Sequence, residues 1–334
     1  MNPFFTSLFT TNEDILSIPL TIDGFSLKLE AGGVDLSSDS VYWFKPYRSA
    51  DFPEVTTSKD WFFIWSTDHD QPNGSAPGGI WWGEADDLAL TNFTELGLIR
   101  QGNQAETPFL YRIPTERSGL TSDVIFLYFH TDSSDPQNPG SLQQTRLITT
   151  TGGALHTATW NDRGIPVDTS SIPNIGLYHT GYFQIINDTG TEFLAAHQLY
   201  DGSVLPADLW GYSTSADGLT FTFREAEENE SGSPSGYTSY NPMNSYFDLN
   251  GQKYALQMLR LESGSSIGFT DKRMAFATAN NDFTLNSFIQ FIEDDLVSNV
   301  SYHVDGDTAH VYAIRGDKVT IGQDEVWYGT ITLY

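Results

Sequence analysis

The chain has 334 residues, with 43 acidic side chains against 16 basic ones and a formal net charge of -27. This charge argues against a nucleic-acid partner, because the phosphate backbone would be repelled over most of the surface. No stretch approaches the ~20 apolar residues of a membrane-spanning helix, so membrane insertion is not expected. Cysteine is absent, so disulfides and thiolate chemistry are not expected either.

The N-terminal residues do not resemble a secretory leader. Residues 1–9 lack a basic region, and Asn12, Glu13 and Asp14 follow before an apolar run has formed. The protein therefore stays where it is made, has lost a leader, or leaves the cell by another route such as host lysis. Among these, an extracellular or virion-associated location is favoured.

The first predicted element lies near the N-terminus, over residues 17–29. Apolar residues alternate along it, at Leu20, Ile22, Phe25, Leu27 and Leu29. Alternation with a period of two predicts a β-strand with one buried face. Residues 1–40 form an N-terminal segment that contains this strand.

From residue 41 onward, the same order of short elements recurs five times, in units of about 41–100, 101–168, 169–230, 231–288 and 289–334. The first element of each unit lies at residues 52–55, 107–110, 180–183, 244–247 and 300–303. A second, almost continuously apolar element follows at 62–65, 125–129, 193–196, 254–258 and 311–314. Continuous apolarity predicts a strand that is covered on both faces.

Each unit continues with a third element, at residues 80–83, 146–149, 209–212, 273–276 and 327–330. In four units a polar turn and one aromatic residue come next, namely Phe93, Trp160, Phe221 and Phe283. This pattern predicts a short outer strand. The fifth unit has no such strand, so the N-terminal strand is expected to supply it and to close a ring.

These elements predict an all-β protein, a five-bladed β-propeller of four-stranded antiparallel blades. Two packed β-sandwiches are the alternative, because regularly spaced short strands are also typical of that architecture. In a propeller, the first strand of each blade lines the central channel, and residues near its start converge on one funnel. The candidates there are Arg48, Asp51, Glu106, Arg112, His179, Tyr240, Asn241, Asn299 and Ser301.

Over residues 41–334 this layout resembles the five-bladed propeller glycoside hydrolases of the arabinanase, xylosidase and invertase-like group. Asp51, in Arg48-Ser49-Ala50-Asp51-Phe52-Pro53, resembles in position the Asp that acts as base or nucleophile in that family. Glu106, in Ala105-Glu106-Thr107-Pro108, resembles the acid of the family's Glu-Gly-Pro. Cleavage of a glycosidic bond needs two such groups, one to protonate the leaving oxygen and one to activate water or attack carbon.

The sequence departs from that family, which has an Asp on the second blade and the Glu on the third. Here the Glu lies on unit two, and His179 lies on unit three. In a smaller related group a His serves as the acid, so the resemblance implies Asp51, Glu106 and His179 as a catalytic set. Arg48 or Arg112 would orient a carboxylate or an acidic sugar, and Trp43, Tyr240 and Asn241 complete the expected substrate-binding residues.

Structural roles are the alternative for most of these residues. Arg48 with Asp51, and Arg112 with Glu106, have the spacing of ion pairs that join blades. His69, His130 and His197 recur just after the second strand of three units, which favours a repeated structural hydrogen bond over a metal site. Most of the tryptophans that could stack on sugar rings are expected in the core, namely Trp43, Trp61, Trp81, Trp82 and Trp210.

No catalytic metal or cofactor is expected. Two loops carry oxygen ligands that could hold a structural Ca²⁺, but solvated turns are the simpler interpretation. These are Asp68, Asp70 and Asn73, and Asp132, Asp135 and Asn138. Two functions stay open: a propeller that binds and hydrolyses a polysaccharide or oligosaccharide at the channel mouth, and a non-catalytic glycan-binding or virion structural protein, such as a phage tail or capsid-surface component. Assembly into a virion or a homo-oligomer would fit the second.

Overall fold

A computed structural model gives the fold of most of the chain. The structure describes residues 23–30, 41–67, 78–102, 105–131, 144–167, 179–200, 208–228, 237–249, 252–261, 272–280, 285–292, 297–306, 308–315 and 325–332. Strands dominate these segments. Of the helices, a single α-helical turn, α2 (Thr115–Ser118), and a 3-10 turn, η2 (Ser49–Asp51), are described.

The described strands form five four-stranded antiparallel sheets. The first contains β2 (Val41–Arg48), β3 (Trp61–Thr67), β4 (Gly79–Ala85) and β5 (Thr94–Gln101). The second contains β6 (Glu106–Arg112), β7 (Ile125–Thr131), β8 (Gln144–Thr150) and β9 (Asn161–Gly164). The third contains β10 (His179–Asp188), β11 (Phe193–Tyr200), β12 (Asp208–Ser215) and β13 (Thr222–Glu228).

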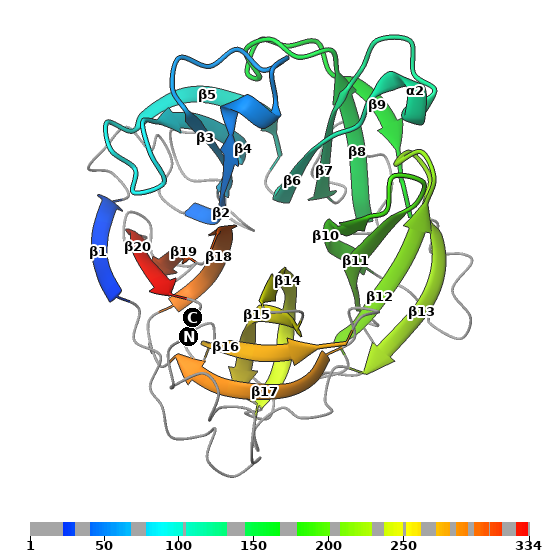
Figure 1. Ribbon diagram of the computed structural model, residues 1–334. Helices are drawn as coiled ribbons and strands as arrows, with labels where there is room; N and C mark the ends of the chain where they lie inside the picture. Colours follow the sequence, from blue (N-terminus) through cyan, green and yellow to red (C-terminus); the bar gives the residue numbers. More distant parts are fainter. Residues whose placement is uncertain are drawn as a thin grey trace.

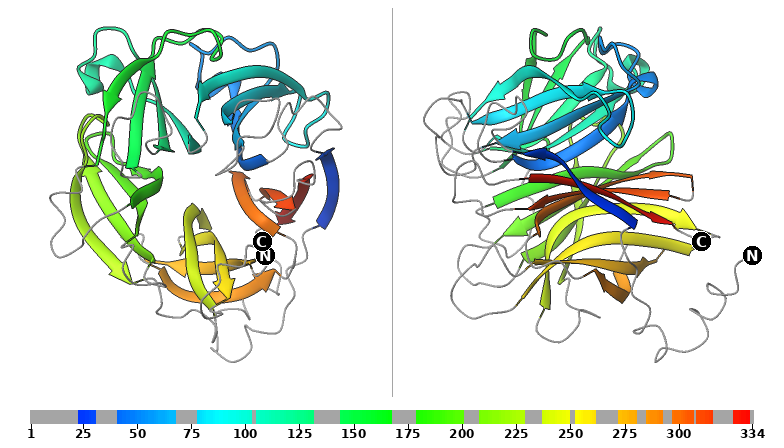
Figure 2. Two further views of the ribbon diagram at one scale, coloured as in Figure 1. Left: turned by 180° about the vertical axis from the view of Figure 1, so that it is seen from behind. Right: turned by 90° about the vertical axis from the view of Figure 1, so that its left-hand side faces the viewer.

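The fourth sheet contains β14 (Tyr237–Leu249), β15 (Gln252–Leu261), β16 (Lys272–Ala279) and β17 (Leu285–Ile292). The last contains β18 (Val297–Asp305), β19 (Thr308–Arg315), β20 (Glu325–Thr332) and β1 (Asp23–Glu30). Figures 1 and 2 show the sheets arranged around a common centre, with β2, β6, β10, β14 and β18 nearest to it. This is a propeller of antiparallel four-stranded blades, and the sandwich alternative is wrong.

Strand β1 pairs antiparallel with β20, the last strand in the sequence. The register aligns Ser26 with Tyr328 and Glu30 with Glu325. The N-terminal segment therefore supplies an outer strand to the sheet of β18, β19 and β20, at the place where the sequence pattern lacks one. Residues 17–22 of the predicted strand lie outside the described residues.

One predicted strand was wrong. The segment 52–55 was expected to open the first unit, but the innermost strand of that sheet is β2, eleven residues earlier. The reason is Pro46, which has no backbone N–H and interrupts the apolar pattern of β2. Because β2 is the inner edge of its sheet, a proline is tolerated there.

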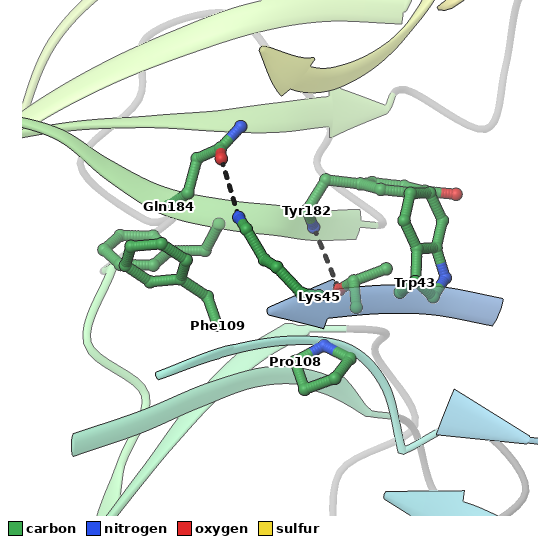
Figure 3. A pocket seen from close by; sticks show the side chains of 8 residues that line it. Trp43, Lys45, Pro108, Phe109, Tyr182 and Gln184 are labelled. Atoms are coloured by element: carbon green, nitrogen blue, oxygen red, sulfur yellow. Dashed lines mark hydrogen bonds between the residues drawn. The ribbon is translucent and has the colours of Figure 1, made fainter. Parts of the chain in front are cut away.

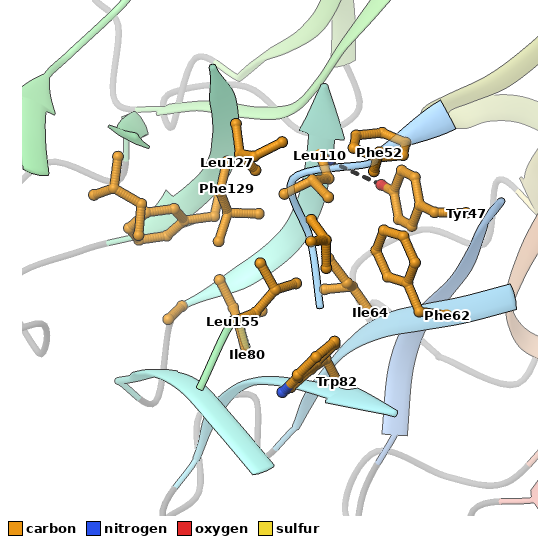
Figure 4. Packing of buried hydrophobic residues seen from close by; sticks show 14 residues of the cluster. Tyr47, Phe52, Phe62, Ile64, Ile80, Trp82, Leu110, Leu127, Phe129 and Leu155 are labelled. Atoms are coloured by element: carbon orange, nitrogen blue, oxygen red, sulfur yellow. Dashed lines mark hydrogen bonds between the residues drawn. The ribbon is translucent and has the colours of Figure 1, made fainter. Parts of the chain in front are cut away.

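The core lies between neighbouring sheets. The interface between the first two sheets packs Ile64 and Trp82 against Leu127 and Phe129, and all four side chains are almost completely buried (Figure 4). The middle strands β3 and β7 are buried along nearly their whole length, as their continuous apolar sequences predicted. Burial of each large apolar side chain contributes roughly 1.5–3 kcal/mol.

The aromatic residue before an outer strand fixes that strand to its sheet. Phe93, directly before β5, contacts the rings of Phe44, Phe63 and Trp65 at centroid distances of 5.8, 6.0 and 5.8 Å. Gly83 makes room for it, since a Cβ there would lie 2.8 Å from the Phe93 ring. The outer strand that this position predicted is present as β5, although with eight residues it is not short.

The innermost strand of each of the first three sheets has the same irregularity. Trp43 in β2, Thr107 in β6 and Tyr182 in β10 have φ angles of 59°, 52° and 56°. The pairing register of each strand shifts around that residue. A bulge of this kind turns a side chain out of the regular alternation, and such backbone strain is common at functional sites.

Candidate functional site

The bulged residues of β2, β6 and β10 converge on one narrow pocket between these three strands (Figure 3). The space inside amounts to about 10 Å³, which is roughly one water molecule and far less than a sugar ring. Its lining combines aromatic and polar side chains, namely Trp43, Lys45, Thr107, Pro108, Phe109, Tyr182, Phe183 and Gln184. None of these lining residues carries a carboxylate.

Lys45 is the charged group of this pocket. Its Nζ donates a hydrogen bond to Gln184 Oε1 at 3.2 Å and lies 4.6 Å from the centre of the Phe109 ring. Burial lowers the pKa of Lys45 to about 8, because the apolar walls disfavour the ammonium form. On the other side, the rings of Trp43 and Tyr182 meet edge to face at 4.8 Å.

A more open group of residues lies at the C-terminal end of β2. Arg48 and Asp51 are exposed there, and Arg48 is the register partner of Trp61 on β3. The half-buried Trp61 ring contacts His303 of β18 at a centroid distance of 5.0 Å. Burial lowers the pKa of His303, and the charges of Asp305 and Asp51 act in the opposite direction. We call Arg48, Asp51, Trp61 and His303 the mouth cluster.

Glu106, an expected catalytic residue, lies in the interior of the second sheet. Its side chain is 4% exposed, and its Oε1 lies 2.7 Å from Nδ1 of His130, which is 1% exposed. The two residues are register partners on β6 and β7. Glu106 does not line the pocket, although its neighbour Thr107 does.

Arg112 was expected to pair with Glu106, and this pairing is wrong. Arg112 binds Glu54 instead, with Nε donating to Oε2 at 2.8 Å. Hydrogen bonding to Arg112 holds the pKa of Glu54 below its usual value. The physical reason is strand length: Glu106 and Arg112 are the first and last residues of β6, and seven residues of strand span about 20 Å.

The same pairing locates Asp51 relative to Glu106. Glu54 follows η2 by three residues and is fixed to the C-terminal end of β6, so Asp51 lies toward that end. Glu106 begins the strand at the opposite end. Within the described residues, Arg48 and Asp51 form no ion pair with each other. The two expected catalytic carboxylates therefore lie toward opposite ends of the innermost strands.

Several expected site residues stay predictions. His179 is the first residue of β10, and Tyr240 and Asn241 lie in β14, but their side chains are outside the described residues, as is that of Asn299. Ser301 Oγ donates to the carbonyl oxygen of Phe44 and thereby ties β18 to β2. No group of three or more metal-ligating side chains occurs in the described part of the chain, and both candidate Ca²⁺ loops fall outside it.

The recurring histidines form structural hydrogen bonds where the structure describes them. Besides the pair of His130 and Glu106, His197 Nε2 lies 2.8 Å from Ser213 Oγ and is fully buried. His69 lies outside the described residues. Among the tryptophans, Trp43, Trp81 and Trp82 are in the core, and Trp61 is half-buried.

Sequence reasoning missed most of the residues in these two groups, among them Lys45, Gln184, Tyr182 and His303. A signal existed for Lys45, because a lysine beside a proline within an otherwise apolar segment is a poor core residue. Gln184 and Tyr182 follow the predicted strand start of the third unit, but the bulge that turns them toward Lys45 leaves no mark in the sequence.

Among the helices that the structure describes, none has the length and apolar character needed to span a membrane.

No family model matches the chain, and no curated protein matches it. Solved structures of similar fold include glycoside hydrolases. One named only as a glycoside hydrolase matches with a TM-score of 0.63 and 11% identity, over 91% of this chain and 90% of its own. An endo-arabinase from Bacteroides thetaiotaomicron matches with a TM-score of 0.54 and 11% identity, over 92% and 98%. A family 117 glycoside hydrolase from the marine bacterium Zobellia galactanivorans gives 0.53 and 11%, over 92% and 90%.

Proposed function

We propose that this chain is a carbohydrate-active propeller that binds a polysaccharide or oligosaccharide at a mouth of its central channel. The observation that carries this proposal is the mouth cluster. In it, exposed Arg48 is the register partner of half-buried Trp61, the Trp61 ring contacts His303, and the charge of exposed Asp51 acts on His303. The folds of the similar structures, which include glycoside hydrolases, add support.

The chemistry of the mouth cluster suits a sugar. An indole ring offers a flat apolar face to the C–H groups of a pyranose or furanose ring. Arginine and aspartate supply planar groups that donate to and accept from neighbouring hydroxyls. This combination of one apolar face with a few convergent polar groups is typical of small-molecule sites.

The geometry favours binding of the saccharide without its hydrolysis by Asp51 and Glu106. Hydrolysis needs two carboxyl groups about 5–9.5 Å apart around one bond. Glu106 is buried against His130 at the other end of β6, and so does not meet this condition with Asp51. A catalytic set of Asp51, Glu106 and His179 stays a prediction that an activity measurement can test.

We also infer that the five sheets form one five-bladed ring, which the pairing of β1 with β20 closes. In that arrangement β2, β6, β10, β14 and β18 surround the channel, and the mouth cluster flanks its opening. A role in a virion, an extracellular location and self-assembly stay predictions. A structural Ca²⁺ in the loops that contain Asp70 or Asp135 is likewise a proposal, and calorimetric titration with Ca²⁺ would test it.

The proposal is tested by binding to a panel of polysaccharides in affinity gel electrophoresis. Trp61→Ala is expected to reduce strongly the retardation that a bound polysaccharide causes, and Arg48→Ala to weaken it less. Trp327→Ala is the matched control, because Trp327 is also partly buried but lies on β20, outside the mouth cluster. Equal retardation of wild type and Trp61→Ala would overturn the proposal.

Release of reducing ends from the same panel decides between binding and hydrolysis. We expect no release by the wild-type protein. Release that Asp51→Asn abolishes would instead establish hydrolysis and return Asp51 to the catalytic role that the family resemblance implies.

A further inference from the structure

A second hollow lies far from the channel, at the rim of the second sheet. It measures about 430 Å³, within the usual range of ligand pockets. Segment 119–123, directly after α2, forms one side, and the outer strand β9 forms the other through Asn161, Asp162 and Arg163. Figure 1 shows α2 and β9 at the periphery, away from the innermost strands. We call this hollow the rim pocket.

Asp123 fixes the polar groups of the rim pocket. Its side chain is only 3% exposed, and its Oδ2 accepts hydrogen bonds from Thr149 Oγ1, Asn161 Nδ2 and Arg163 Nη2 at 2.7, 2.7 and 2.8 Å. Burial raises the pKa of Asp123, but these three donors outweigh it and hold the pKa below the usual value. The carboxylate is therefore ionised and rigid without any ligand.

The same network leaves polar capacity for a ligand. Among the described residues, Oδ1 of Asp123 has a single long contact, 3.5 Å from Ser122 Oγ. Arg163 uses Nε toward Thr149 and one Nη2 hydrogen toward Asp123, so several of its five N–H groups are not engaged in these bonds. The Asn161 amide oxygen accepts no hydrogen bond from the described residues. Groups already held in place bind a ligand at low entropic cost.

The charges of the rim pocket cancel. Asp123 is paired with Arg163, and Asp162 is paired with Arg146, whose Nε donates to Asp162 Oδ1 at 3.1 Å. Each carboxylate thus has its own guanidinium, in a chain whose net charge is -27. A neutral pocket does not select a metal cation or a phosphate. It suits an uncharged ligand that offers several hydroxyl groups.

We propose that the rim pocket is a binding site for a neutral saccharide unit, separate from the channel mouth. A sugar hydroxyl donates to Asp123 Oδ1, and neighbouring hydroxyls accept from Arg163 and donate to the Asn161 amide oxygen. The site does not depend on the function proposed for the mouth cluster. If both exist, the propeller engages a polysaccharide at two places.

The test is a titration of the full chain with glucose, galactose, arabinose and xylose, each to 100 mM. The readout is the ¹⁵N NMR signals of the Arg163 and Asn161 side chains. At least one sugar is expected to shift these signals in a saturable way. Asn161→Ala is expected to weaken that sugar's affinity roughly three- to tenfold, as the loss of one neutral hydrogen bond implies. Asn161 is exposed, so this variant is expected to fold.

Thr220→Ala is the matched control, because Thr220 is exposed and precedes the outer strand β13 of the next sheet. Its affinity should equal that of the wild type. Trp61→Ala should also leave the Arg163 and Asn161 responses unchanged, which separates the rim pocket from the channel mouth. Absence of a response to all four sugars would overturn the proposal. A response to inorganic phosphate or Ca²⁺ in place of the sugars would overturn it as well.

Discussion

Glu106 and His130 face each other across strands β6 and β7, with Oε1 and Nδ1 2.7 Å apart and both side chains almost completely buried. A carboxylate in such a position stabilises the fold, because removal of one partner leaves the other polar group without a hydrogen bond in an apolar interior.

Replacement of Glu106 tests whether this residue is structural. Glu106→Ala is expected to lower the free energy of unfolding by roughly 1–3 kcal/mol, since His130 then loses an acceptor in the core. Glu106→Gln should cost less, because the amide oxygen can still accept from His130. Urea unfolding measures both. If Glu106→Ala were as stable as the wild type, the structural role would be wrong.

His197 makes the protein sensitive to mild acid. Burial lowers the pKa of His197 from its ordinary value of 6.5 to about 3. The unfolded chain therefore binds a proton that the folded chain does not, so stability falls as the pH drops from about 6.5 toward 3. Once the pH lies below both pKa values, the loss of unfolding free energy amounts to about 4–5 kcal/mol.

The expected signature is a difference between two pH profiles. His197→Gln should be less stable than the wild type at pH 7, and this difference should shrink as the pH falls to 4. Urea unfolding at several pH values compares the two proteins and removes the contribution of the carboxylates, which both share. Parallel profiles would contradict the prediction, because they would show that folding does not shift the pKa of His197.

Gly211 lies directly over the ring of His197. A Cβ at position 211 would come within 2.3 Å of His197 Cε1. Gly211→Ala is expected to destabilise the protein by about 1–3 kcal/mol, as overpacking in a close-packed core does. The double variant with His197→Ala should cost less than the sum of the two single changes, because the smaller side chain restores room. Thermal unfolding of all four proteins tests this, and additive effects would contradict it.

Lys45 is predicted to be a poor ammonium site. Its pKa of about 8 lies below the ordinary value of 10.5, so the unfolded chain binds more protons between these values and stability rises with pH across that interval. Lys45→Met keeps the length of the side chain without the charge. Relative to the wild type, it should gain stability at pH 7 and lose that advantage as the pH rises from 8 to 10.5. A constant difference over this interval would contradict the prediction.

Much of the fold could be predicted from the sequence, because the middle strands are apolar on both faces. The segments 62–65 and 125–129 fall within β3 and β7 for this reason. The first strand of the first sheet could not be predicted in the same way. β2 carries Lys45, Pro46 and Arg48, which interrupt any periodic pattern. Its residues are determined by the channel that they line, not by a single buried face.

The candidate site was harder to predict than the fold. Asp51 was expected near a channel mouth and is the exposed last residue of η2. Glu106 was expected in the same place, but the register of β6 with β7 directs it to His130. One bulge decides which of two neighbours, Glu106 or Thr107, reaches the channel wall, and bulges depend on pairing between strands that are distant in the sequence.

The pairing of β1 with β20 has a consequence for how the protein folds. Residues 23–30 and 325–332 lie side by side, although about 300 positions separate them in the chain. Contacts of such long sequence separation form slowly, because a large loop must close before they stabilise anything. Until then β20 has an unpaired edge, which invites pairing with a second chain. The last sheet is therefore where a partly folded molecule is most exposed to aggregation.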